Sequence, residues 1–122
     1  MKTLTKTAMV LAFFMAATMA QADDAAMKKE LLGYWASGRH AYLFKDDGIS
    51  YMLGGTSKSK WDIRNGMYYE SNVDGTNALK PAKIISLTKS KFTTQDAGGT
   101  YTLKRLTQED AEKTYGKPGE LP

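Results

Sequence analysis

Residues 58–66 read Lys58-Ser59-Lys60-Trp61-Asp62-Ile63-Arg64-Asn65-Gly66. All the charged side chains of this stretch occupy even positions, whereas Trp61 and Ile63 occupy odd ones. Because successive side chains of a β-strand point to opposite faces, this alternation predicts a strand with one buried face. Asn65-Gly66 then predicts a tight hairpin turn, since both residues accept a positive φ at low cost.

The Asn65-Gly66 turn allows two registers, which differ in the direction of Glu70. A two-residue loop places Trp61 opposite Glu70 and turns the carboxylate inward. A three-residue loop that starts at Arg64 places Trp61 opposite Tyr69 and turns Glu70 outward. Burial of a lone carboxylate is costly unless it is paired or protonated. We therefore favour the three-residue loop, with Tyr69 on the inner face.

Seven further runs of strand-forming residues lie on either side of this stretch. They are rich in aromatic, branched and threonine residues, and turn residues separate them at a spacing of roughly 8–12 positions, which is typical of sandwiches and barrels. No long stretch between residues 33 and 106 has helical periodicity. We therefore predict an all-β fold, a small eight-stranded antiparallel up-and-down barrel. Its strands would be Gly33–Ser37, His40–Phe44, Ile49–Leu53, Ser59–Arg64, Met67–Ser71, Ala82–Leu87, Lys91–Thr94 and Thr100–Leu106.

A second tight hairpin is predicted at Asp47-Gly48. This turn is expected to place Tyr42 and Phe44 on the same face as Tyr51, with Ser50 on the opposite face.

Short helices are predicted before the first strand and after the last. The segment Asp23–Leu32 begins with two acidic residues, which the helix dipole favours at an N-terminus, and Gly33 ends it. At the other end Thr107 provides an N-cap for a helix that runs to Tyr115, and Gly116 stops it.

The first 22 residues have the composition of a secretory signal peptide. Lys2 and Lys6 make the start basic, residues 7–19 are largely apolar, and Ala20-Gln21-Ala22 places small residues where a signal peptidase reads. The apolar run is too short for a membrane anchor, which needs about 20 residues. We expect cleavage after Ala22, with Ala20 as the second choice. The product would be a single domain of residues 23–122, periplasmic or secreted, with no integral membrane segment.

Composition narrows the classes of partner. The chain has 17 basic and 13 acidic residues, a formal charge of +4. Two of the basic residues, Lys2 and Lys6, precede residue 23, so the mature domain carries +2, too little to indicate a nucleic-acid partner. The chain has no cysteine and a single histidine, His40. It therefore lacks the three or four nitrogen or sulfur ligands of a zinc site, and we expect no metal and no cofactor.

The ends of the predicted meander are expected to meet at Trp35 and Arg105. Closing a meander brings the first and last strands together. In the last run Arg105 shares a face with Tyr101 and Leu103, which places its guanidinium at the inner edge. A guanidinium there suits an aromatic plane, and Trp35 in the first run is the natural candidate.

These features resemble the lipocalins and their smaller bacterial lipocalin-like relatives, of the calycin type. The resemblance rests on the G-x-W of Gly33-Tyr34-Trp35 after a short helix, and on Arg105 at the end of the eighth run; it covers about residues 26–106. In such barrels the first-strand tryptophan packs under a basic residue of the final strand and closes one end. This barrel is shorter than a full lipocalin. Eight strands enclose a space just wide enough for their own side chains or for one small ligand.

The resemblance implies a non-enzymatic binding protein for a small apolar or amphipathic ligand. The candidate ligand contacts are the aromatic side chains expected on the inner face: Tyr42, Phe44, Tyr51, Trp61, Tyr69 and Tyr101.

Two other functions remain open from the sequence. The alternative is a protein-interaction module, such as an inhibitor or accessory factor of an envelope enzyme, with contacts in the loops Lys45–Gly48, Asn72–Lys80 and Gln95–Gly99. An enzyme would need an inward-facing acid, such as Glu70 in the two-residue register, together with His40. Nothing in the sequence selects an acid to orient His40, so no catalytic residue is assigned.

Overall fold

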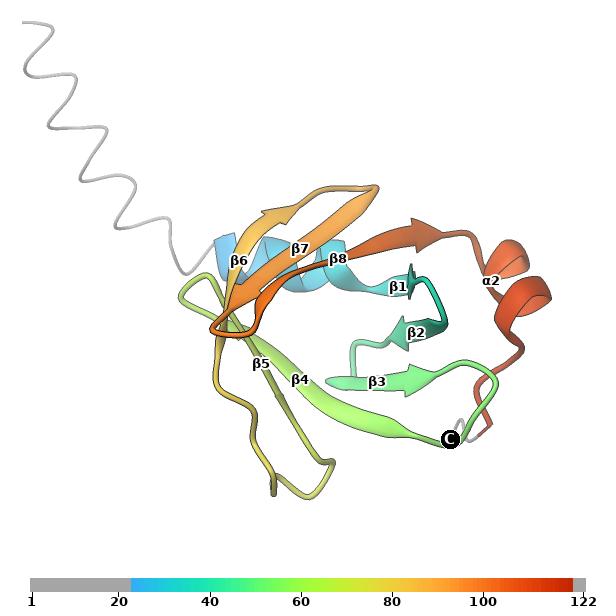
Figure 1. Ribbon diagram of the computed structural model, residues 1–122, viewed down its shortest axis with the longest axis horizontal. Helices are drawn as coiled ribbons and strands as arrows, with labels where there is room; N and C mark the ends of the chain where they lie inside the picture. Colours follow the sequence, from blue (N-terminus) through green and yellow to red (C-terminus); the bar gives the residue numbers. More distant parts are fainter. Residues whose placement is uncertain (1–22, 120–122) are drawn as a thin grey trace, which may run out of the picture.

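Eight strands form a closed antiparallel barrel in the computed structural model, which describes residues 23–119 (Figure 1). Each strand pairs with the next in the chain, and β8 pairs with β1 to complete the ring. The all-β class, the eight strands and the up-and-down order are therefore confirmed. The expected signal peptide lies outside the described residues. The strands are β1 (Gly33–Ser37), β2 (His40–Phe44), β3 (Ile49–Met52), β4 (Lys58–Arg64), β5 (Met67–Ser71), β6 (Ala82–Leu87), β7 (Lys91–Asp96) and β8 (Gly99–Leu106).

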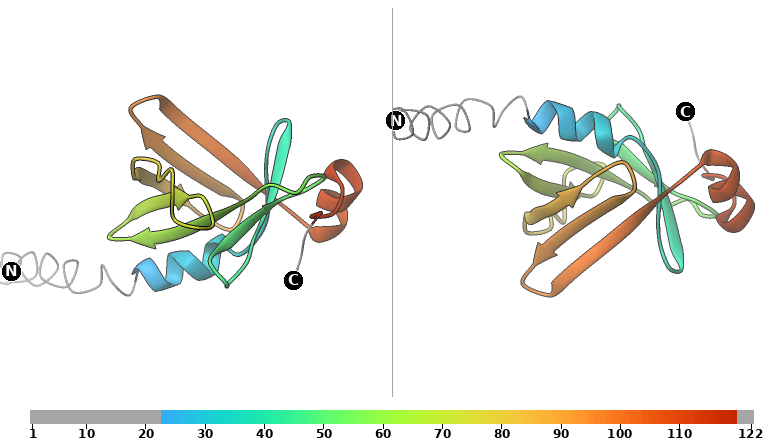
Figure 2. Two further views of the ribbon diagram at one scale, coloured as in Figure 1. Left: turned by 90° about the horizontal axis from the view of Figure 1, so that it is seen from below. Right: turned by 90° about the horizontal axis from the view of Figure 1, so that it is seen from above.

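A short helix lies near each end of the described chain, and the two helices are well apart (Figure 2). The N-terminal helix spans residues 23–31, and α2 spans Gln108–Tyr115. Thr107 caps α2, because its hydroxyl accepts a hydrogen bond from a backbone N–H of the first turn. Ala111 of α2 is buried in a small cluster that includes Ala41 of β2. The second helix thus packs on the outside of the barrel.

The β4–β5 hairpin has a two-residue loop, so the three-residue loop favoured from the sequence is wrong. Asn65 and Gly66 have φ values of 52° and 73°, and two consecutive positive φ angles are what a two-residue type I′ turn requires. Trp61 therefore lies opposite Glu70, and both face the interior. The Asp24 carboxylate accepts hydrogen bonds from the backbone N–H groups of Asn65 and Gly66, which fixes the turn against the N-terminal helix.

The β2–β3 hairpin has a three-residue loop, one residue longer than the tight turn predicted at Asp47-Gly48. Phe44 lies opposite Ser50, and the N–H of Gly48 donates to the carbonyl of Lys45 at 3.2 Å. Gly48 has a φ of 80°, as the last residue of a three-residue hairpin loop commonly does. The extra residue moves Ser50 to the inner face and Tyr51 to the outer one. The expected inward position of Tyr51 is therefore wrong.

The N-terminal helix closes one end of the barrel over Trp35. Trp35 and Leu31 are fully buried, and the indole Nε1 donates a hydrogen bond to the carbonyl of Leu31 at 2.8 Å. Edge-to-face contacts, with ring centroids 5.4 to 6.5 Å apart, join the interior aromatic rings in one chain: Trp35, Phe92, Tyr68, Phe44 and Trp61. Such contacts fix ring orientations beyond simple burial, so this end of the barrel has a rigid core.

The expected contact between Arg105 and Trp35 is present at the seam between β8 and β1. The two residues lie opposite each other, and the guanidinium carbon is 4.2 Å from the indole centroid. The guanidinium also donates hydrogen bonds to three backbone carbonyls, those of Glu30, Leu32 and Lys89. Two of these carbonyls belong to the end of the N-terminal helix, where a cation is favoured. Arg105 thus ties the helix, the first strand and the last strand together.

Substitution of Gly33 is expected to destabilise the protein because of its close approach to this arginine. Its φ is +118°, and an added Cβ would lie 2.8 Å from the Arg105 Nη1. We expect Gly33→Ala to lower the free energy of unfolding by about 1–3 kcal/mol, from backbone strain and displacement of the guanidinium, as measured by urea denaturation. The matched control is Gly38→Ala, which has a φ of +59° and nothing within 4 Å of the new Cβ. Equal losses in the two variants would show that the close approach to Arg105 is unimportant.

The pairing between β5 and β6 is short. Only two pairs of residues face each other across it, Met67 with Lys83 and Tyr68 with Ala82. Beyond them residues 72–81 form a loop outside the strands, and one backbone hydrogen bond, from the Leu79 N–H to the Glu70 carbonyl at 2.9 Å, joins this loop to β5. The mouth of the barrel therefore has a less continuous wall on this side.

Candidate functional site

A cavity of about 700 Å³ occupies the open end of the barrel. It falls within the range of about 300–1,000 Å³ that is usual for small-molecule sites. The interior is therefore divided: side chains fill the end beneath the N-terminal helix, and the other end is hollow.

The floor of the cavity is aromatic and firmly packed. Phe44 and Phe92 line it and are almost fully buried, at 4% and 3% exposure. Tyr68 lies between them, 6.5 Å from Phe44 and 5.4 Å from Phe92 between ring centroids. The same rings pack downward onto the tryptophan layer, so the floor is preorganised for an apolar group.

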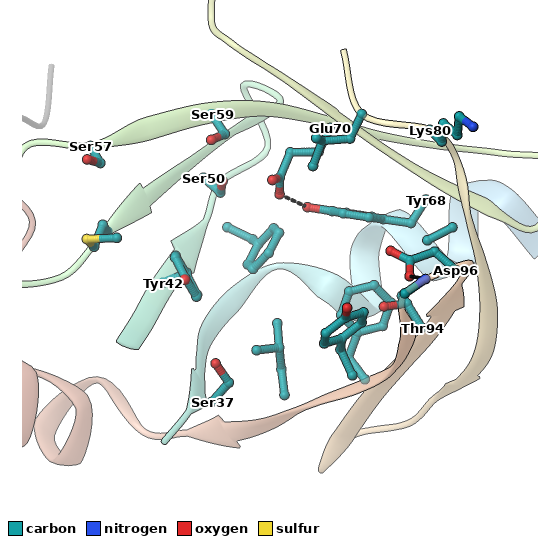
Figure 3. A pocket seen from close by; sticks show the side chains of 18 of the residues that line it. Ser37, Tyr42, Ser50, Ser57, Ser59, Tyr68, Glu70, Lys80, Thr94 and Asp96 are labelled. Atoms are coloured by element: carbon teal, nitrogen blue, oxygen red, sulfur yellow. Dashed lines mark hydrogen bonds between the residues drawn. The ribbon is translucent and has the colours of Figure 1, made fainter. Parts of the chain in front are cut away.

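The wall on the β3–β4 side is polar. Figure 3 shows the hydroxyls of Ser50, Ser57 and Ser59 arranged along this side of the cavity. Ser50 comes from the inner face of β3, where the three-residue loop has placed it. The cavity thus combines an apolar floor with hydrogen-bonding groups higher up, as an amphipathic ligand requires.

Glu70 is the most distinctive group of the site. Its Oε1 accepts a hydrogen bond of 2.8 Å from the hydroxyl of Tyr68, two residues earlier on the same face of β5 (Figure 3). Burial raises the pKa of Tyr68 well above its usual value, and the charge and hydrogen bond of Glu70 raise it further. The pKa of Tyr42 is also raised, first by burial and then by Glu70. Among residues 23–119, Glu70 forms no ion pair with a lysine or arginine.

Three of the six aromatic residues predicted as ligand contacts line the cavity: Tyr42, Phe44 and Tyr101. Tyr101 stands at the rim and is 55% exposed. Trp61 faces inward as expected but lies beneath the cavity, packed edge-on against Phe44 at 5.6 Å and outside its lining.

The other two predicted contacts, Tyr51 and Tyr69, lie on the outer face, so their expected inward orientation is wrong. The Tyr51 hydroxyl donates to the Asp47 carboxylate at 2.9 Å, and Arg64 stacks on the Tyr69 ring at 3.9 Å. Both errors follow from the two loop lengths. Ser50 faces inward in place of Tyr51, and Tyr68 and Glu70 face inward in place of Tyr69. The preference of Asn-Gly for a two-residue turn was the signal that would have found Tyr68 and Glu70.

Among the described residues, neither a metal-binding cluster nor the histidine lies at the cavity. No group of three or more His, Cys, Asp and Glu side chains able to hold a metal ion occurs within residues 23–119. His40 is exposed and does not line the cavity with Glu70. Over the same residues, none of the helices has the length and apolar character needed to span a membrane.

Comparison of the chain with protein-family models, with curated proteins and with solved structures gives no match. The closed eight-stranded antiparallel barrel is compatible with a calycin-like fold. The function is therefore argued from the geometry of the cavity.

Proposed function

We propose that this protein is an exported, non-enzymatic, lipocalin-like binding protein that holds one small amphipathic molecule in the mouth of its barrel. The observation that carries the proposal is the cavity of about 700 Å³ above a rigid aromatic floor. A cavity of this size is uncommon in a small domain, whose interior is normally close-packed. A ligand would bury its apolar part on Phe44 and Phe92 and leave its polar part among the serines.

The arrangement of acids and bases supports binding over catalysis. The carboxylate in the cavity is hydrogen-bonded to a tyrosine whose pKa is raised, so that tyrosine keeps its proton at neutral pH. General acid–base or nucleophilic catalysis needs a second positioned group, and His40 is not part of the cavity lining.

Export is proposed from the first 22 residues, and lipocalin kinship from the G-x-W and the Arg105 contact. The short helix after Ala22 closes one end of the barrel in the mature domain, and the cavity faces solvent at the other end. A binding role in the periplasm or outside the cell is consistent with this arrangement.

A protein-interaction role has weaker support. Within residues 23–119 the exposed large apolar side chains of the 72–81 loop are Val73 and Leu79, at 42% and 61% exposure. Leu79 lines the rim of the cavity, so ligand binding already accounts for its exposure. Apart from the cavity-lining Tyr101, that leaves Val73 in the loop and Ile85 on β6, which is 49% exposed. Two single residues on separate segments are too little for a protein interface.

The proposal is tested with N-phenyl-1-naphthylamine, an uncharged dye that fluoresces in apolar sites. We expect saturable binding at one dye per protein, lost when the protein is unfolded in urea. Native mass spectrometry of protein purified from its own source should show a retained small molecule. Absence of both saturable dye binding and a retained molecule would overturn the proposal, and a retained protein subunit in its place would favour the interaction role.

A further inference from the structure

Glu70 places a negative charge inside the cavity where an amphipathic ligand would put its head group. It is half-buried on the inner face of β5, above the aromatic floor. Its Oε1 accepts the hydrogen bond from Tyr68. A carboxylate has room for about four hydrogen bonds, so Glu70 retains acceptor capacity toward the cavity.

The other charged groups around the cavity do not neutralise this carboxylate. Figure 3 shows the Lys80 side chain pointing away from the cavity. Lys58 lies at the edge of the cavity lining; it is exposed and pairs with the outward-facing Tyr51, so its side chain starts from the outer face of β4. Asp96 at the rim accepts a hydrogen bond from the N–H of Gly98 at 2.7 Å and adds a second negative charge. An anionic head group would therefore meet like charge within the cavity.

Three tyrosines share the cavity with this carboxylate. The Tyr68 hydroxyl donates a hydrogen bond to Glu70, the charge of Glu70 helps to raise the pKa of Tyr42, and Tyr101 of β8 also lines the cavity. Ring faces attract organic cations, and this attraction grows when the cation is partly desolvated. A carboxylate flanked by tyrosines thus offers a cation both a counter-charge and polarisable walls.

We propose that the ligand is a cationic amphiphile, an organic ammonium whose head group lies at Glu70 between Tyr42 and Tyr68 and whose apolar tail rests on Phe44 and Phe92. This inference rests on the proposed ligand-binding function and specifies its ligand class. A primary ammonium would donate hydrogen bonds to the carboxylate, and a quaternary one would rely on the ring faces.

The test compares ligands that differ only in head group. Octylammonium, octyltrimethylammonium, octyl sulfate and 1-octanol share one chain, and each competes with N-phenyl-1-naphthylamine for the wild-type protein. We expect the tighter-binding ammonium to exceed octyl sulfate at least about tenfold in affinity, with 1-octanol in between. The order of the two ammonium ligands shows whether hydrogen bonds or ring faces dominate.

The second arm uses Glu70→Gln, which keeps the shape of the side chain and removes its charge. We expect this variant to bind the uncharged dye as before and to lose the preference for ammonium over sulfate. The matched control is Glu109→Gln on the exposed face of α2, which makes the same change in net charge and should keep the preference.

Each outcome is decisive. Dye binding with equal affinity for all head groups, or with sulfate preferred, would overturn the ammonium inference and leave the binding function standing. The ammonium inference is equally overturned if Glu70→Gln keeps its dye binding and its full ammonium preference. Failure of the wild-type protein to bind the dye at all would overturn the binding function, and this inference with it.

Discussion

Arg105→Ala is expected to lower the free energy of unfolding by about 3–5 kcal/mol, a large loss for one substitution. The guanidinium donates hydrogen bonds to the carbonyls of Glu30, Leu32 and Lys89 and lies over the Trp35 ring. Its removal leaves these carbonyls without their charged donor and uncovers the indole at the seam. Urea denaturation followed by tryptophan fluorescence measures the loss, and near-ultraviolet circular dichroism shows whether the aromatic core remains ordered.

Arg64→Ala is the matched control for that experiment. Arg64 also stacks on an aromatic ring, Tyr69, and pairs with Asp62 at 3.3 Å, but its side chain is 60% exposed. Exposed pairs of this kind contribute about 1 kcal/mol or less. Arg105→Lys should recover only part of the stability, because an ammonium cannot reproduce the planar fork of donors. Similar losses in Arg64→Ala and Arg105→Ala would refute a special role for the seam.

Thr94→Trp is expected to weaken binding of N-phenyl-1-naphthylamine at least about 100-fold, because the indole would fill the space that the dye needs. Thr94 lies on the inner face of β7, opposite Tyr101, and lines the cavity (Figure 3). Since the cavity is open, the new ring should fit without displacing the core. The free energy of unfolding is expected to change by less than about 1 kcal/mol or to increase.

Thr93→Trp provides the comparison on the same strand. Thr93 faces outward, and its hydroxyl lies 3.0 Å from that of Thr102 on the outer surface. Dye binding by this variant should equal that of the wild type. If Thr94→Trp left dye affinity unchanged while folding normally, the dye site would lie elsewhere and the cavity would lose its assignment.

The bounds of the strands could be predicted from the sequence because turn-forming residues separate the strand-forming runs clearly. Four of the eight strands have the predicted bounds, and the others differ by one or two residues at an end. The helix capped by Thr107 was also predictable, because a hydroxyl cap and early acids are local signals. The contact of Arg105 with Trp35 followed from closure of the meander, which sets the ends of the chain side by side.

The inner face was harder to predict, because one residue more or less in a hairpin loop turns every side chain of a strand to the other face. The three-residue β4–β5 loop was favoured because burying the Glu70 carboxylate is costly, but this cost applies only if the interior is fully packed. In the structure the carboxylate instead faces a cavity and accepts a hydrogen bond from Tyr68. Whether eight strands enclose a filled or a hollow space depends on how all the side chains pack together, and the alternation of single strands does not contain that information.

Because β5 and β6 share only a short pairing, the barrel is expected to open more easily there than at the seam between β1 and β8. Local opening is easiest where few backbone hydrogen bonds must break, and this stretch of wall lies beside Glu70, far from the arginine seam. Amide protons near Ala82 should therefore exchange with solvent sooner than those of β1 and β8. Ligand entry would therefore widen the cavity at the β5–β6 edge, while the aromatic core beneath the N-terminal helix keeps its shape.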